Sequence, residues 1–368
     1  TYSKYTNFGM QKFRVDFDGQ KNLRMNDESK FNFKIPRYAE LLMDTYVVVN
    51  LPTIWSPIEA PTKSTSTPKY NTWRPYEFKW IKNLGCQMIK EITIYAGRQI
   101  IQKYSGQYLQ NMVERDYSET KKKAFYEMTG NVPELNDPAN CNGLVNQYPN
   151  AFPIKTSSSG PEPSIRGRKL YIPINSWFSN TSKMAFPLVS MQYNELHIEI
   201  IMRPIKELYV IRDVDDIDND GPYLSPKFAP IDSSLYKFIQ PPSYNSDYVL
   251  HYDDQRNLWN ADIHLICNYC FLSEDEVKVF AYKDQKYLIK NIQEYEFPHV
   301  VNSNKVQMKT HGLISNWMWY FNRTDVHMRN EWSNYTNWPY EYIPYTVDIN
   351  YGNGSNNAYQ PVGIARGI

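Results

Sequence analysis

The chain has 368 residues, with 40 Lys and Arg against 39 Asp and Glu, and 42% of its residues are hydrophobic. The formal charge of +1 excludes the strongly basic surface that nucleic-acid-binding proteins present to phosphates. No apolar run approaches the about 18 residues of a membrane-spanning helix, and the hydrophobic content is too high for a disordered chain. The length predicts about two domains, each able to bury a core.

The first half of the chain alternates apolar and polar residues in short segments, which is typical of strands that lie with one face on a core. A single helical region interrupts them, Gln107–Gly130, with a division at Tyr117 and Ser118 and a terminal glycine. Two segments have loop composition, Pro52–Pro75 and Asn131–Arg168. The alternating segments are Phe13–Phe17, Phe31–Ile35, Leu170–Ile174 and Leu196–Ile200.

A third loop-like segment, Arg203–Asp247, is acidic and then rich in proline. It lies between two strand-rich halves, so we interpret it as the connection between two domains. Beyond it, alternation returns in Ile263–Phe271 and Leu313–Phe321. Many strands with long proline-rich loops predict an all-β protein built from tandem sandwich or jelly-roll domains.

Short helices are predicted between the strands of the second half. Ser273 and Glu276 form a capping box in front of an apolar run, and Leu288, Ile289 and Ile292 are spaced as on a helix over 284–293. Two later stretches are unusually aromatic. We interpret Trp317–Phe321 as a core strand and Asn330–Trp338 as an aromatic connection or interface.

The four cysteines are too sparse and uneven for a disulfide framework, so we expect a reducing compartment. No apolar segment follows the first residues, and we expect no secretory leader. Cys267 and Cys270 have the spacing of zinc ligands, but residues three apart on a strand face opposite sides. Because Cys86 and Cys141 are distant in sequence and supply no second pair, we interpret Cys267 and Cys270 as a buried structural cysteine and a neighbour.

Two further motifs could hold a metal ion. Asp216–Gly221 matches the first half of a calcium loop, but Lys227 stands where the completing glutamate belongs, which favours a solvated acidic linker. His251 and Asp253 would share a face of a strand, and His299 would complete the facial triad of an iron(II) oxygenase. Both matches specify few residues, so we expect no catalytic, cofactor-binding or metal-binding residue, and no cofactor.

The remaining motifs are weak. Lys121–Lys123 and Arg166–Lys169 are basic clusters that a solvated helix face and a loop edge explain. Glycosylation sequons, which matter only in a secreted protein, begin at Asn180, Asn322, Asn334 and Asn353.

Several stretches, in the same order, resemble major capsid proteins of nucleocytoplasmic large DNA viruses, and capsid proteins of polinton-like viruses are similar. The matches run through nearly the whole chain, which makes them more specific than any single motif. They are Lys4–Phe8 with the family's "HTNF", Leu170–Phe178 with "IPLPFWF", Ala185–Leu196 with "ALPLIALQYHEV", Asn268–Glu276 with "DYIFLDxxER", Tyr287–Ile289 with "YLIEQ" and Gln360–Gly363 with "QPSG".

The resemblance implies two tandem eight-stranded jelly rolls and a structural, non-enzymatic protein of an icosahedral capsid. It places the first roll at 1–205, the connection at 206–248 and the second roll, incomplete in this chain, at 249–368. The implied partners are two further copies in a pseudo-hexagonal homotrimer, neighbouring capsomers, and minor capsid and penton proteins. An inner membrane would be contacted indirectly, with no nucleic acid or small-molecule substrate bound. The implied location is the virion, assembled in the host cytoplasm.

Two alternatives stay open at this point. One is a viral scaffold of the same fold that shapes a membrane and is later lost. The other, from a different class, is an iron-dependent β-helix oxygenase that uses His251, Asp253 and His299.

Overall fold

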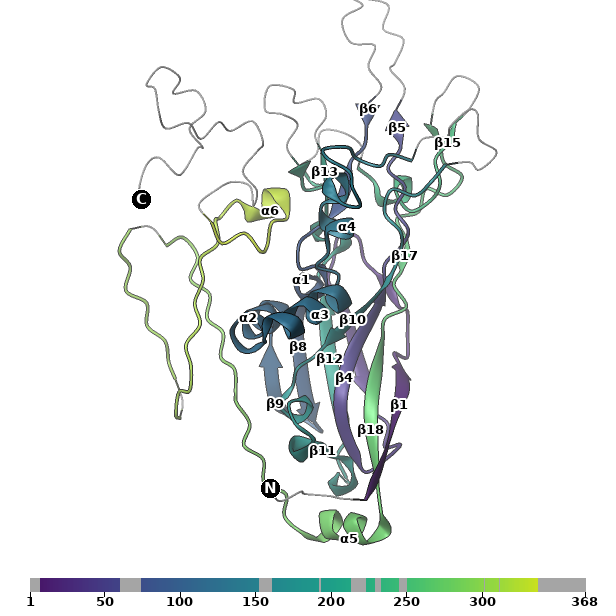
Figure 1. The fold of residues 1–368 in the computed structure, drawn as a ribbon. Helices are drawn as coiled ribbons and strands as arrows, with labels where there is room; N and C mark the ends of the chain where they lie inside the picture. Colours follow the sequence, from purple (N-terminus) through teal and green to yellow (C-terminus); the bar gives the residue numbers. More distant parts are fainter. Residues whose placement is uncertain are drawn as a thin grey trace, which may run out of the picture.

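The computed structural model describes residues 7–59, 74–151, 161–191, 193–212, 223–228, 233–244, 250–300, 302–310 and 312–336. Two antiparallel sheets face each other in the body of the molecule (Figure 1). The first sheet consists of β1 (Phe8–Asp16), β18 (His264–Leu272), β4 (Leu41–Asn50) and β10 (Lys169–Pro173) in that order, with β11 (Phe186–Pro187) also beside β4. The second consists of β3 (Ser29–Lys34), β12 (Leu196–Met202), β8 (Ile89–Ala96) and β9 (Gln99–Tyr104).

The strand order is that of a jelly roll. In chain order the eight long strands are β1, β3, β4, β8, β9, β10, β12 and β18. Counted in this order, the first sheet places the first strand beside the eighth, then the third and the sixth. The second sheet places the second strand beside the seventh, then the fourth and the fifth. The last strand therefore returns to lie between the first and the third, which closes the wrap. β18 pairs with β1 from Phe8↔Leu272 to Asp16↔His264, and with β4 on its other side. The prediction of an all-β jelly roll is confirmed.

The pairing of β18 crosses the domain division expected from the sequence, which stays a prediction. β18 lies in the predicted second roll (249–368), yet it completes the sheet of the first. The predicted connection (206–248) is also not a free linker: β13 (Tyr209–Arg212) pairs with β7 (Phe78–Trp80), and Phe238 is buried in the same core. The physical reason is that β1 and β4 would each present an open edge unless a strand filled the space between them.

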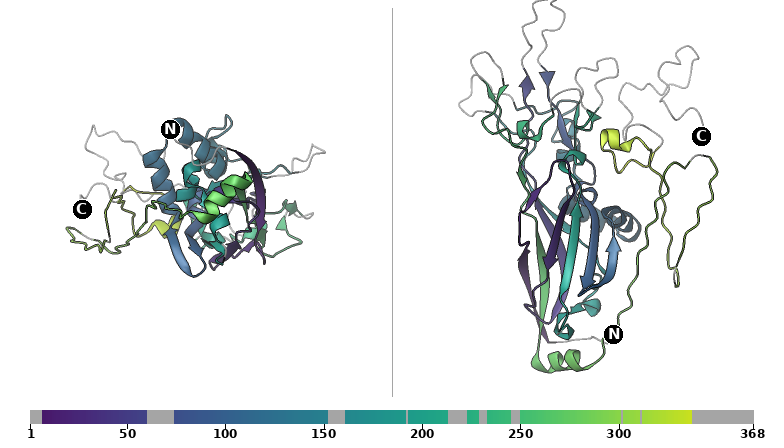
Figure 2. Two further views of the ribbon diagram at one scale, coloured as in Figure 1. Left: turned by 90° about the horizontal axis from the view of Figure 1, so that it is seen from below. Right: turned by 180° about the vertical axis from the view of Figure 1, so that it is seen from behind.

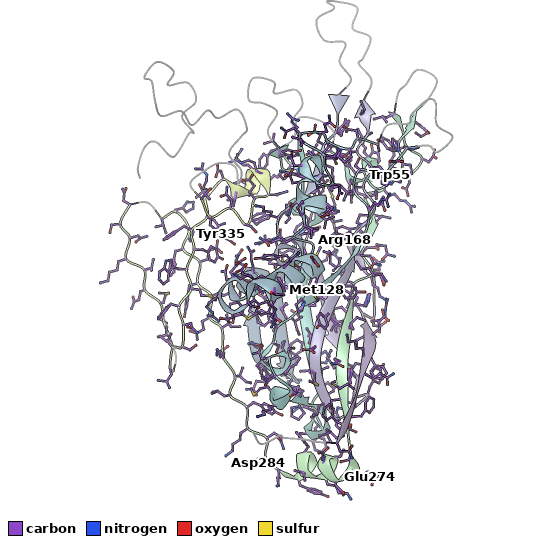
Figure 3. The ribbon with its side chains drawn as sticks, in the orientation of Figure 1. Trp55, Met128, Arg168, Glu274, Asp284 and Tyr335 are labelled. Atoms are coloured by element: carbon purple, nitrogen blue, oxygen red, sulfur yellow. The ribbon has the colours of Figure 1, made fainter. Side chains whose placement is uncertain are left out.

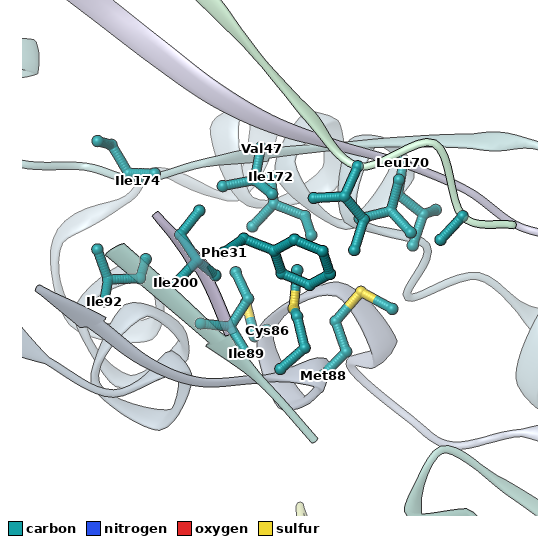
Figure 4. Packing of buried hydrophobic residues seen from close by; sticks show 14 of the residues in the cluster. Phe31, Val47, Cys86, Met88, Ile89, Ile92, Leu170, Ile172, Ile174 and Ile200 are labelled. Atoms are coloured by element: carbon teal, nitrogen blue, oxygen red, sulfur yellow. The ribbon is translucent and has the colours of Figure 1, made fainter. Parts of the chain in front are cut away.

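Apolar side chains from both sheets meet in one core. Phe31 and Ile200 from the second sheet pack towards Val47 and Ile172 from the first (Figure 4). These four residues are 2% exposed or less, and burying each large apolar side chain contributes about 1.5–3 kcal/mol. The alternating residues predicted to face a core therefore do so in β3, β10 and β12.

Shorter strands and helices pack around the two main sheets. A three-stranded sheet contains β14 (Tyr223–Leu224), β13 and β7, and three strand pairs complete the structure: β15 (Ser243–Tyr244) with β16 (Leu250–His251), β17 (Trp259–Asn260) with β2 (Asn22–Leu23), and β5 (Ile58–Glu59) with β6 (Arg74–Pro75). The helices are α1 (Leu84–Met88), α2 (Gly106–Asp116), α3 (Glu119–Thr129), α4 (Pro133–Asn136), α5 (Glu274–Tyr282) and α6 (Val326–Arg329). No helix among the described residues is long and apolar enough to cross a membrane.

The helix predicted over 107–130 is present and divides where expected, between α2 and α3. The Ser105 hydroxyl accepts a hydrogen bond from the backbone N–H of Tyr108 at 3.1 Å, which caps α2. Gly130 ends α3 with a φ of 79°, a left-handed conformation that glycine adopts without strain. α5 follows the predicted cap residue Ser273, although Glu276 accepts a hydrogen bond from the backbone of Asn7 instead of closing a capping box.

α2 begins in unusually close contact with α1. A Cβ atom added to Gly106 would lie 1.9 Å from the backbone oxygen of Cys86 and 2.4 Å from that of Ile89. Only glycine fits there, because both obstacles are backbone atoms that a rotamer change cannot move.

Two predicted elements beyond α5 are wrong. Residues 284–293 form no helix, and 313–321 form no strand. The first segment runs extended past the edge strand β9, where the Lys290 carbonyl accepts a hydrogen bond from the Gln102 side chain at 3.2 Å. A helix this short is marginal on its own, so such contacts decide its conformation. Residues 313–321 pair with no strand in the part of the chain that is described.

Candidate functional site

The structure does not assemble the predicted iron triad. His251 and Asp253 do approach each other, with 3.4 Å between Nε2 and Oδ1, but their side chains are 68% and 95% exposed. His299 lies on the segment after α5, in a left-handed conformation. No group of three His, Cys, Asp or Glu side chains that could hold a metal ion occurs among the described residues.

Cys267 and Cys270 diverge as expected. Cys267 points into the main core, whereas Cys270 packs on the other face of β18 with Leu41 and Phe280 of α5. All four cysteines are free thiols, and Cys86 is also buried in the core. Cys86, Cys267 and Cys270 are therefore packing residues, and the two cysteines of β18 do not converge on a common zinc position.

A thiol reagent added to the native protein at pH 8 is expected to modify Cys141 and to spare the other three cysteines. Burial raises the pKa of Cys86 and Cys267 to about 12 and that of Cys270 to about 11, so these thiols stay protonated and covered. Cys141 is only half-buried. Mass spectrometry of peptides, with a denatured sample as the control, measures the labelling; rapid native labelling of Cys270 would contradict the packing described.

Other predicted motifs are accounted for by the surface or lie outside the described residues. The calcium-loop residues 216–221 lie outside them. Lys122 of α3 pairs with Glu114 and Glu119 at 3.2 Å each, and residues 166–169 are exposed, as expected of solvated clusters. Of the sequons, Asn180 and Asn322 are exposed, Asn334 is 1% exposed, and residue 353 is not described.

A charged cluster closes one end of the β1–β18 pair. The Arg14 guanidinium donates to both Asp16 and Asp262, at 2.7 Å each, and Lys21 bonds to Asp16. Hydrogen bonding to Arg14 holds the pKa of both carboxyls below their usual range. His264 is buried beneath them, with its Nδ1 2.6 Å from the backbone oxygen of Asp262.

Acidification from pH 8 to pH 5 is expected to destabilise the protein through His264. Burial lowers its pKa in the fold below the ordinary 6.5, and the charge of Arg14 adds to this, although Asp262 and Asp16 oppose it. The unfolded chain therefore binds the proton more readily. The stabilisation is present above pH 6.5 and is lost as the pH falls through the folded pKa.

Urea midpoints measured across this pH range test the expectation. His264→Asn keeps a donor near the Asp262 carbonyl but does not titrate, so its midpoint should depend less on pH. The exposed His299→Asn serves as the matched control and should follow the parent protein. Equal pH dependence in the parent and in His264→Asn would contradict the assignment.

The segment after α5 forms a projecting apolar arm, which we define as residues 295–322. It stands off to one side of the two sheets (Figures 1 and 2). Every described residue of the arm is exposed, including Leu313 at 104% and Trp319 at 78%. The Tyr295 hydroxyl donates to the Lys309 carbonyl, which holds two parts of the arm together. Large exposed apolar surfaces of this kind mark interaction sites.

After the arm the chain packs against the body again. We call this segment, residues 325–336, the clip. The Asn330 side chain donates to the carbonyls of Lys206 and Tyr209 at 2.7 and 2.8 Å, and the Trp332 indole donates to that of Glu207 at 3.0 Å. The clip therefore binds two carbonyls of the turn that joins β12 to β13 and the carbonyl of the first residue of β13.

An open apolar groove lies at the end of the roll near α5, away from the clip. In Figure 3, Glu274 and Asp284 mark this end, and Trp55 lies towards the far end. Its volume is about 420 Å³, and Trp177, Phe186 and Tyr287 are among the residues that line it. The Tyr287 hydroxyl donates to the Ala185 carbonyl at 2.9 Å, which ties the segment after α5 to the body beside the groove.

The first two thirds of the chain match a known protein family. Residues 1–247 match the family described as major capsid protein N-terminus, which is about two thirds of the chain. The chain belongs to this family. The resemblance stated from the sequence is thereby confirmed.

Similar curated proteins carry the same description. The chain is 24% identical over 334 residues to the major capsid protein of Chrysochromulina ericina virus. The aligned region covers 87% of this chain and 52% of the viral protein. For the major capsid protein of Phaeocystis pouchetii virus the identity is 22% over 320 residues, with the same two coverages. The chain therefore spans about half the length of the curated relatives it matches.

Two solved structures are also similar. The PBCV-1 virus capsid is 15% identical with a TM-score of 0.45, covering 79% of this chain and 49% of that one. The Faustovirus major capsid protein is 10% identical with a TM-score of 0.45, covering 76% and 57%. At these scores the jelly-roll assignment rests on the strand order of this chain and not on the superposition.

Proposed function

We propose that this chain is a major capsid protein, a structural subunit in the icosahedral shell of a large double-stranded DNA virus, with no catalytic role. The observation that carries the proposal is the family match over residues 1–247. The exposed, unassembled His251, Asp253 and His299 give no support to an oxygenase.

The closed roll suits this role physically. A shell subunit must stack against copies of itself without uncontrolled pairing of strand edges. Because β18 fills the space between β1 and β4, the first sheet ends at β1 and β10 only, and the wrap brings these edges close to the second sheet. The near-zero net charge limits repulsion between densely packed copies.

The proposal extends to assembly and to domain organisation. The first roll would run from residue 1 to 282, up to the end of α5, and a second roll would begin at residue 283. The exposed arm supports this division, because its alternating residues have the pattern of a strand and lack a core in the described structure. Three copies would form a pseudo-hexagonal homotrimer that contacts neighbouring capsomers and minor capsid and penton proteins.

Light scattering of the purified protein tests the proposal, combined with electron microscopy of particles. We expect three times the mass of one chain and a six-sided outline. A stable monomer at micromolar concentration would contradict the assembly. Stoichiometric bound iron that is lost in His251→Ala would contradict a purely structural role, and a closed shell that lacks the protein would favour the scaffold alternative.

A further inference from the structure

We propose that the clip is a staple that sets the orientation of the second roll on the first. The inference rests on the two-roll organisation proposed above. The clip follows the arm directly, so any domain that includes the arm is tied to the first roll through it.

The contact with the turn between β12 and β13 is directional. Asn330 and Trp332 bind the carbonyls of Lys206 and Glu207 in this turn and of Tyr209, the first residue of β13. A shift of the clip by one residue would break all three hydrogen bonds at once. A purely apolar contact could slide instead, because the hydrophobic effect has no preferred direction.

Asn330 is the centre of the staple. It is 2% exposed and holds a φ of 53°, the left-handed conformation that asparagine tolerates better than most residues. Trp332 strengthens the same contact, because its ring stacks under the Arg203 guanidinium at 4.5 Å. Arg203 in turn pairs with Glu207 at 3.3 Å. Backbone, side chain and partner thus specify one arrangement.

A second set of contacts joins the clip to α1 and α2. The Ser333 hydroxyl accepts from the side-chain amides of Asn83 and Gln87, at 3.1 Å each, and lies 3.4 Å from the Oε1 atom of Gln110. Gln107 of α2 donates to the Tyr335 hydroxyl. The clip therefore bridges two separate parts of the first roll, which fixes its rotation as well as its position.

Further contacts join the clip to the body. A small cavity of about 30 Å³ lies at the junction with β7, lined among others by Trp80, Arg329 and Trp332. The backbone also takes part, since the Ser225 N–H donates to the Met328 carbonyl at 2.8 Å.

The test uses the full chain and the substitution Asn330→Asp. Aspartate has the same size and tolerates the same backbone conformation, but it replaces the amide donor with a carboxylate that faces two carbonyls. We expect amide hydrogen exchange at Asn334 and Ser225 to accelerate about 100-fold, since two buried hydrogen bonds are lost. The matched control is Asn316→Asp, on the exposed arm, which should exchange like the parent protein.

Cryo-electron microscopy of the assembled variant measures the angle between the rolls. A changed or variable angle in Asn330→Asp, with melting of the first roll within a few degrees of the parent, supports the staple. Unchanged exchange, or faster exchange with an unchanged angle, overturns it. Trp332→Phe keeps the stack on Arg203 but removes the indole donor, and should give about a tenfold acceleration if Asn330→Asp fails to fold. If the parent protein forms no trimer, the proposed function fails, whereas the exchange measurement still reports on the clip of the monomer.

Discussion

A chain shortened to residues 1–248 is expected to lose cooperative folding, although it contains all of the predicted first roll and the connection. It lacks β18, so β1 loses its partner in the first sheet and β4 loses its partner on one side. Leu265 and Tyr269 leave the core with it, at about 2–5 kcal/mol for each large side chain, together with the whole β1–β18 ladder. The loss is comparable to the about 5–15 kcal/mol that stabilises a typical domain.

The matched control is a chain of residues 1–283, which retains β18 and α5. Thermal unfolding followed by near-ultraviolet circular dichroism should give one cooperative transition for this chain and none for the shorter one. Cooperative unfolding of both chains at similar temperatures would show that the roll closes without β18, and would favour the boundary predicted from the sequence.

Gly106→Ala is expected to destabilise the protein by about 3 kcal/mol, the upper end of the cost of overpacking. Helix propensity alone favours the opposite sign, because alanine is better than glycine in a helix by about 1 kcal/mol. Steric exclusion outweighs it here, since the new methyl group would lie 1.9 Å from the Cys86 carbonyl oxygen and the α1–α2 contact would have to open.

Urea unfolding measures this difference, and Gly9→Ala is its matched control. Gly9 lies in β1, and an added Cβ would have nothing within 4 Å, so the midpoint should hardly change. A Gly106→Ala protein as stable as the parent would mean that α1 and α2 separate at little cost. In that case the clip, which binds both helices, would also be less firmly seated than described.

The elements that the sequence predicts well have a local cause. The strands β3, β10 and β12 follow from alternation, and the division of α2 from α3 follows from Tyr117 and Ser118 together with the terminal Gly130. Cys267 and Cys270 diverge because neighbouring residues of a strand alternate between faces. Each of these statements needs only a few consecutive residues.

The elements that it predicts wrongly depend on distant partners. The alternation in His264–Leu272 indicates a strand but cannot indicate that β1 and β4 receive it. Residues 313–321 alternate in the same way and have no strand beside them in the described chain. The clip residues Asn330 and Trp332 were suggested only by an aromatic composition that is typical of interfaces, since their partners are backbone carbonyls that no side-chain pattern reveals.

The position of β18 also has a consequence for the time course of synthesis. The β1–β18 ladder joins residues that are about 250 positions apart, which makes the roll a fold of high contact order and predicts slow folding. At about 5–20 residues per second, a ribosome needs roughly 12 to 50 s to reach β18 after it has made β1. During that interval β1 and β4 are exposed on many nascent chains of the same polysome, so this protein is expected to depend on chaperones during translation and not only at assembly.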